Sequence, residues 1–215
     1  MPTWIEILGR LAAFTAAPAA IGVMLTAGTL VVIQDWRISV FTLVIQYILV
    51  GLLLMTVIRP EVAVIKMLVG TMICPVFYVT ARWVGWGRAP EPIPERAARP
   101  RWYLPTEMPF RLLAVLIVML ATYRLAAQYP LPELPPAASL ATYTLVALGM
   151  LALGLTEEPL KAGMGLLTFM AGFELFYAAL EPSISVIGLL GLINFLITLA
   201  TSYLTAARAG LGGMP

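Results

Sequence analysis

The 215-residue chain contains no histidine and only one cysteine, and 11% of its residues are charged. Without histidine, it lacks the ligands of a bis-histidine haem, the usual zinc catalytic sites and imidazole acid–base chemistry. Cys74 alone can neither hold an iron–sulfur cluster nor form an internal disulfide. The sequence has no phosphate-binding glycine loop and no nucleophile paired with a base. We therefore expect no bound cofactor and no metal, and the composition argues against an enzyme that acts alone.

Hydrophobic residues make up 61% of the chain, and the mean hydropathy is +0.95. Both values lie far from those of soluble domains. A bilayer core roughly 30 Å thick is crossed by about 20 helical residues, and several uncharged runs reach this length. The runs lack the two-residue alternation of barrel strands. The sequence therefore predicts an all-α polytopic membrane protein, with residues 1–215 forming a single transmembrane domain.

Seven transmembrane helices are expected. Their ranges are near 5–33, 38–58, 62–82, 108–127, 137–156, 162–180 and 183–207. The fourth range is the least regular, because Arg111 and Arg124 bracket its uncharged core and must reach the interface or find partners. The segment 83–107, rich in proline and arginine, is expected to be a loop.

Basic residues indicate the orientation of the chain, since lysine and arginine are retained on the cytoplasmic side of a membrane. Arginines gather in and around the loop 83–107, so we place this loop in the cytoplasm. Alternation of the seven helices then puts the N-terminus outside and the C-terminus inside. The basic residues lie at the ends of the apolar runs, not on a stripe with interleaved aromatic residues, so no nucleic-acid partner is expected.

A faint internal repeat relates the two halves of the chain. Asp35 and Glu157 precede the second and sixth expected helices, and they lie 122 residues apart. Pro60 and Pro182 mark breaks after these helices with the same offset. Two three-helix units joined by an extra helix would form a parallel repeat, as some membrane proteins do. Chance coincidence is the alternative.

Four polar residues lie within the expected helices. Gln46 and Asn194 fall near the middle of their helices. At about 1.5 Å per residue, Glu174 lies roughly 4 Å and Lys66 roughly 9 Å outward of the midpoints, so these two side chains can share a level. Ionisable groups at such depth are costly unless they pair or meet water. Interhelical hydrogen bonding is the alternative for Gln46 and Asn194, and reaching the outer interface is the alternative for Lys66.

Glu174 is the principal candidate for an ion path. A buried carboxyl group can stay neutral and pass a proton, whereas a neighbouring lysine holds it ionised, and either state suits a relay. A structural hydrogen bond is the alternative. Small residues around Glu174 let other helices approach and favour assembly into a larger bundle. They are Gly163, Gly165, Ala171, Gly172, Ala178 and Ala179.

The segment KAGMGLLTFMAGFELFYAALEPSISVIGLLGLINFLITLATSYLTAAR resembles the last two helices of hydrogenase-4 component E, which is similar to the small K-type subunit of respiratory complex I. The segment ISVFTLVIQYILV with Gln46, then Lys66, then CPVFYVTAR, resembles the N-terminal helices of that family. The similarity covers most of the chain. Two features depart from the family: Lys66 and Pro75 are nine residues apart, where a lysine about one helical turn before the proline is usual, and Asn194 stands in a helix that carries a second glutamate in the complex I subunit.

This resemblance implies a membrane-arm subunit of a complex I-like or group 4 hydrogenase-like assembly, where redox chemistry elsewhere drives proton or sodium movement. Glu174 would contribute to the ion path, with Lys66, Gln46 and Asn194 as further candidates. The expected partners are other integral membrane subunits and the lipid bilayer, in the inner membrane of a bacterium or archaeon. A structural subunit of another large complex and a small secondary transporter are the alternatives.

Overall fold

The computed structural model of the chain describes residues 4–85, 107–181 and 183–211, and side chains within 16–85, 108–181 and 183–210. The predicted loop 83–107 therefore lies almost entirely outside the described residues. Seven α-helices and no strand are present in the described part of the chain, which confirms the predicted fold class. The helices are α1 (Trp4–Val32), α2 (Trp36–Leu54), α3 (Pro60–Val84), α4 (Glu107–Gln128), α5 (Pro136–Gly154), α6 (Pro159–Leu180) and α7 (Ile184–Leu211).

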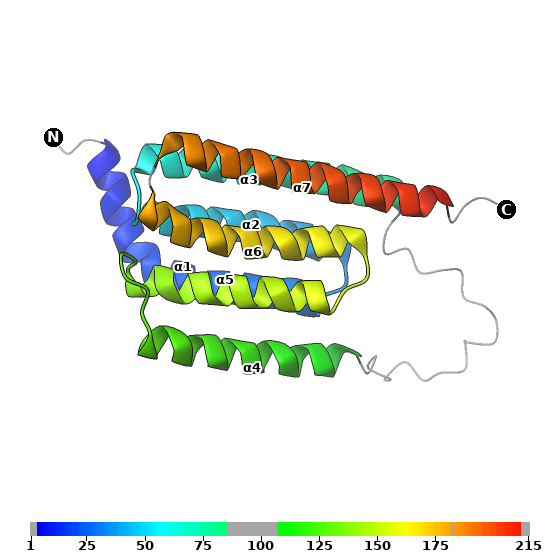
Figure 1. Ribbon diagram of the computed structural model, residues 1–215, viewed down its shortest axis with the longest axis horizontal. Helices are drawn as coiled ribbons and strands as arrows, with labels where there is room; N and C mark the ends of the chain where they lie inside the picture. The colour runs from blue at the N-terminus through cyan, green and yellow to red at the C-terminus, as the bar shows by residue number, and fades with distance from the viewer. Residues whose placement is uncertain (1–3, 86–106, 182, 212–215) are drawn as a thin grey trace.

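Two helix ends differ from the prediction by several residues. α2 ends at Leu54 and not near 58, because the chain turns over the next residues and Arg59 takes an extended conformation before Pro60. A residue that precedes proline is disfavoured in a helix, and Pro60 then starts α3 at a position where proline is tolerated. α7 continues to Leu211, past the expected end near 207. α1 contains Pro18, a residue type that kinks helices, and it is bent before it enters the bundle (Figure 1).

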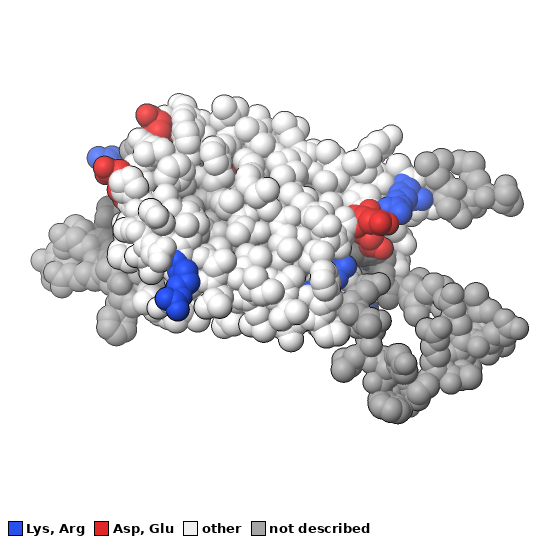
Figure 2. Space-filling model, turned by 60° about the horizontal axis from the view of Figure 1, so that its bottom comes forward, with Lys and Arg blue, Asp and Glu red and all other residues white. Residues whose placement is uncertain are grey.

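Six of the helices, α2 to α7, are long and apolar enough to cross a membrane, and the apolar part of α1 with described side chains, Ala16–Val32, is slightly shorter. Charged atoms in the view of Figure 2 lie toward the two ends of the molecule, and a broad white band separates them. The ends of a transmembrane bundle face water and headgroups, while its middle faces hydrocarbon. The chain is therefore an integral membrane protein in contact with the lipid bilayer.

Six of the seven described helices form two rows of three. Figure 1 draws α1, α2 and α3 behind α5, α6 and α7, in the same order and with the same directions. Contacts join α1 to α5, α2 to α6 and α3 to α7, while α4 lies against α5 and α1. Gln46 of α2 donates a hydrogen bond to Thr168 of α6, and these residues are 122 apart, the offset noted in the sequence. The rows are thus arranged as the parallel repeat predicts.

Glycines bring α5 and α6 into close contact. A Cβ added at Gly149 of α5 would lie 2.5 Å from the backbone nitrogen of Phe169, and one at Gly172 of α6 would lie 2.8 Å from Leu145 Cβ. Gly163 of α6 likewise faces Thr201 of α7. Small residues let backbones approach in this way. The glycines that we expected to favour assembly with other subunits therefore serve contacts inside the chain, and they are no evidence for a partner.

We expect Gly149→Ala to lower the thermal unfolding midpoint in detergent by roughly 5 °C, since overpacking costs about 1–3 kcal/mol. The added methyl group would collide with the backbone of α6, which cannot move as a flexible side chain can. Gly188→Ala is the matched control, because a Cβ added there would meet no atom within 4 Å and alanine favours helix. An unchanged midpoint for Gly149→Ala would contradict the close approach of α5 and α6.

Cations cap helix ends at one end of the bundle, where α1, α3 and α5 end and α2, α4 and α6 begin; we call this the basic end. Lys161, only 2% exposed, donates to the Ile33 carbonyl oxygen at 2.6 Å, beyond the last residue of α1. Arg111 donates to the carbonyl oxygens of Val31 at 3.3 Å and Leu155 at 2.8 Å. Cations stabilise the carbonyl ends of helices. Arg111 thus has the partners that the sequence required, and the basic end is the one that we predict to face the cytoplasm.

Candidate functional site

Glu174 of α6 and Lys66 of α3 form an ion pair inside the bundle. Lys66 Nζ lies 2.5 Å from Glu174 Oε1, and the two residues are 6% and 4% exposed. Of the two interpretations of Lys66, the structure shows pairing and not extension to the interface. Both residues lie nearer the end of the bundle opposite to the basic end, since Lys66 is in the second turn of α3 and Glu174 is in the second half of α6.

Asn194 of α7 completes the immediate surroundings of the carboxylate. Its Nδ2 donates to Glu174 Oε1 at 2.9 Å, and the residue is 1% exposed. The Asn194 Oδ1 atom is buried and has no hydrogen-bond partner in the described part of the chain. α3, α6 and α7 therefore converge on one carboxylate oxygen, and one acceptor beside it has no partner among the described residues.

Burial gives this ion pair a high desolvation free energy and makes the stability of the fold sensitive to loss of either partner. Moving two charges out of water costs several kcal/mol for each ion, and their mutual attraction offsets that cost only with good geometry. Breaking such a pair leaves one buried charge uncompensated. The arrangement therefore couples two events: if Glu174 takes up a proton, Lys66 loses its counter-ion and must find another partner, or release a proton of its own.

Gln46 makes no hydrogen bond to Glu174, although the sequence left that interaction open. Its Nε2 donates to Thr168 Oγ1 at 3.2 Å, and Thr168 is six residues before Glu174 on α6, roughly 9 Å away along the axis. Gln46 is 1% exposed, and its Oε1 atom is buried without a partner among the described residues. The four predicted residues thus form two sites, a charged one with Glu174, Lys66 and Asn194 and a neutral one with Gln46 and Thr168.

Tyr47 is a polar residue that our sequence reasoning missed. Its hydroxyl group is buried without a partner in the described structure, and it lies within electrostatic range of Glu174. The ring fits against Gly70 of α3, where an added Cβ would lie 2.4 Å from a ring carbon. Gly70 follows Lys66 by one helical turn, so the ring is held close to the level of the ion pair. No signal in the sequence indicated Tyr47, since nothing there places its ring against Gly70.

A small void of about 10 Å³ adjoins the ion pair on the side away from the basic end. Lys66 and Glu174 line it together with Leu54, Tyr177 and Ile187. A space of this size is at the lower limit for one water molecule, and two charged groups give a water molecule polar partners. The carboxylate can thus meet water from this side without a wide channel. Among the described residues, no group of three His, Cys, Asp or Glu side chains could hold a metal ion.

Comparison of the chain with protein-family models, curated proteins and solved structures finds no match. The resemblance to hydrogenase-4 component E therefore stays a prediction, and the site is interpreted from its own geometry.

Proposed function

We propose that the chain is a membrane subunit of a redox-driven ion-translocating assembly of the complex I or group 4 hydrogenase type, in which Glu174 carries a proton or binds a sodium ion along the path. The observation that supports this most is the buried Lys66–Glu174 pair, held by three helices that are each long and apolar enough to cross a membrane. Ionisable residues within transmembrane segments mark ion paths and proton relays. The resemblance stated for the sequence points to the same class.

Glu174 has the chemistry of a relay that changes charge at a fixed position. In its ionised state it forms an ion pair with Lys66 and accepts from Asn194. When it takes up a proton, the ion pair is lost, and a later loss of that proton restores it. A neighbouring subunit that alters the charge near Lys66 would therefore shift proton occupancy at Glu174, because an opposite charge nearby favours ionisation.

Space or polar groups lie on both sides of the carboxylate. The water-sized void lies on the side away from the basic end, while the Tyr47 hydroxyl and the Gln46–Thr168 pair lie toward the middle of the bundle. The Tyr47 hydroxyl and Gln46 Oε1 have no partner among the described residues, so a proton or a water molecule can use them. Cys74 lies buried in α3 and is not assigned a role in this path.

A secondary transporter is the second candidate, because two parallel three-helix rows lie against each other as in transporters built from repeats. Its binding site would lie between the rows, at Gln46 and Thr168. A transporter would act alone in vesicles, whereas a subunit would need its partners.

The test is purification of the tagged chain from its native membrane in mild detergent. We expect it to emerge with stoichiometric membrane partners, identified by mass, and the assembly to move ions when an electron donor is supplied. The chain expressed alone should show no redox activity and no bound chromophore. Solute uptake by the isolated chain in vesicles would instead support the transporter, and partners without ion movement would support a structural role.

A further inference from the structure

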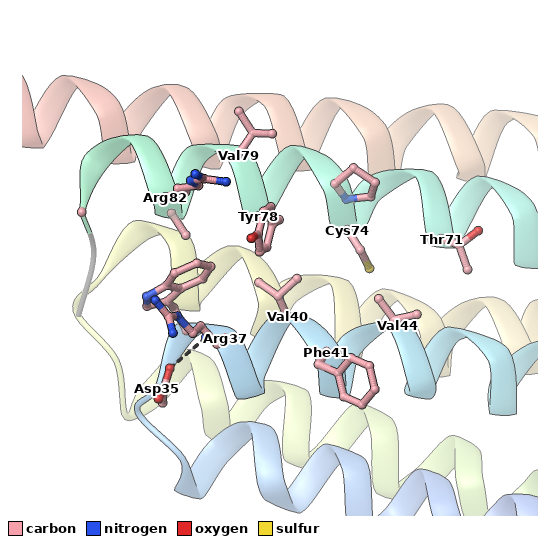
Figure 3. A pocket seen from close by; sticks show the side chains of 14 residues that line it. Asp35, Arg37, Val40, Phe41, Val44, Thr71, Cys74, Tyr78, Val79 and Arg82 are labelled. Carbon is pink, nitrogen blue, oxygen red and sulfur yellow. Dashed lines mark hydrogen bonds between the residues drawn. The ribbon is translucent and has the colours of Figure 1, made fainter. Parts of the chain in front are cut away.

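A groove of about 1110 Å³ lies between α2 and α3, separate from the Lys66–Glu174 site. Its lining comes from α2 and α3 and the residues at their ends, Asp35 and Gly85. Figure 3 shows Val40 and Val44 of α2 and Cys74 of α3 facing the space between the two helices, with Arg37 and Arg82 at its mouth at the basic end. The groove is therefore apolar along its length and basic at one end.

The two arginines at the mouth have no carboxylate partner among the described residues. The Arg82 side chain makes no hydrogen bond or ion pair there, and the Arg37 guanidinium lies 5.3 Å from the ring centre of Trp36. Asp35 Oδ1 accepts from the Arg37 backbone nitrogen at 2.9 Å, so this carboxylate caps α2. Among the described residues, two guanidinium groups against one carboxylate leave the mouth with net positive charge. A phosphate group matches these donors well, because two of its oxygens can accept from one planar guanidinium group.

The length of the groove matches one leaflet of a bilayer. From Arg82 to Thr71, at the inner limit of the lining, α3 advances by roughly 16 Å at about 1.5 Å per residue. Half of a hydrocarbon core that is roughly 30 Å thick is about 15 Å. Trp36 and Tyr78 contact each other near the mouth, with ring centres 5.5 Å apart, at the level where aromatic residues mark the headgroup boundary.

We propose that this groove binds one anionic phospholipid from the leaflet at the basic end. Its headgroup phosphate would lie between Arg37 and Arg82, and an acyl chain would follow Val40 and Val44 toward Thr71. Basic pockets between transmembrane helices on the cytoplasmic side bind anionic lipid headgroups. A transmembrane helix of a partner fits this groove less well, because its charged mouth calls for an anion at one end only. This proposal does not rest on the proposed function.

The test is native mass spectrometry of the delipidated chain titrated with phosphatidylglycerol and with phosphatidylcholine of identical acyl chains. One phosphatidylglycerol per chain should bind about tenfold more tightly than phosphatidylcholine, since a basic residue near the surface contributes about 1 kcal/mol toward an anionic lipid. Arg37→Gln combined with Arg82→Gln should abolish this preference and change phosphatidylcholine binding little. Val44→Phe should weaken both lipids, because it fills the path of the acyl chain.

Arg124→Gln is the matched control, since Arg124 is an exposed arginine in the last turns of α4, at the other end of the bundle. It should keep the wild-type preference. Equal affinity for the two lipids, or a preference that survives the double arginine variant, would overturn the proposal. Displacement of the lipid by millimolar inorganic phosphate would do so too, because it would show a phosphate site without an acyl chain. So would recovery of the assembled complex with a partner helix cross-linked to Phe41 and no lipid in the groove.

Discussion

Glu174→Gln is expected to let the complex assemble, with a lower unfolding midpoint because Lys66 loses its counter-ion, and to reduce ion translocation per electron at least tenfold. Glutamine keeps the size of the side chain and still accepts from Asn194, but it cannot exchange a proton. Positioned proton transfer contributes on the order of 10²–10⁴ to a rate, so loss of the titrating group should outweigh any change in packing. The measurement is ion uptake into vesicles at a fixed rate of electron transfer, over a range of pH.

Glu181→Gln is the matched control, because Glu181 follows the same helix and is exposed. It should behave as wild type. Glu174→Ala separates the structural interpretation from the relay, since alanine leaves Lys66 and Asn194 without their acceptor, at a cost of about 1–3 kcal/mol or more for each buried group. If Glu174→Gln keeps full translocation while Glu174→Ala fails to assemble, the carboxylate is a structural contact and the relay is refuted.

Lys66→Met is expected to be strongly destabilising. It removes the cation and leaves Glu174 buried without a counter-ion, which costs about 3–5 kcal/mol when a buried pair loses one partner. For a chain of this size the unfolding midpoint in detergent should fall by roughly 10 °C. Adding Glu174→Gln should recover most of this loss, because the double variant carries no unpaired charge.

Arg124→Met serves as the control for loss of an exposed cation, and its effect should stay within about 0.5 kcal/mol. Strict additivity of the Lys66 and Glu174 variants would show that the two side chains do not pair in the folded protein. The ion pair and the relay are thus tested in separate experiments, since a stability measurement needs neither other subunits nor an electron donor.

Much of this architecture could be predicted because the bilayer imposes it. Helix number follows from apolar runs of sufficient length, and the level shared by Lys66 and Glu174 follows from a constant rise per residue. The end of α2 was misplaced because the residues before Pro60 are apolar and yet form a turn. Hydropathy does not distinguish an apolar turn from the last turn of a helix.

What the sequence could not show is which helix lies beside which. Asn194 was one of two candidates for the neighbourhood of Glu174, and only the packing of α7 against α6 selects it over Gln46. Tyr47 resembles any other aromatic residue in an apolar run until its ring is found against Gly70. The glycines of α6 carry the same pattern whether they face α5 or another subunit. These distinctions depend on the rotation of each helix about its axis, which the sequence alone does not specify.

The bond between Lys161 and the Ile33 carbonyl oxygen bears on how the chain matures during synthesis. It joins residues 128 apart, so α1 enters the membrane long before its capping lysine exists. At about 5–20 residues per second, the interval is roughly 6–25 s. Throughout it, the Ile33 carbonyl oxygen must be solvated by water at the membrane surface, because Arg111, which is made earlier, bonds to Val31 instead. The end of α1 therefore acquires its full set of contacts only after the start of α6 has been synthesised.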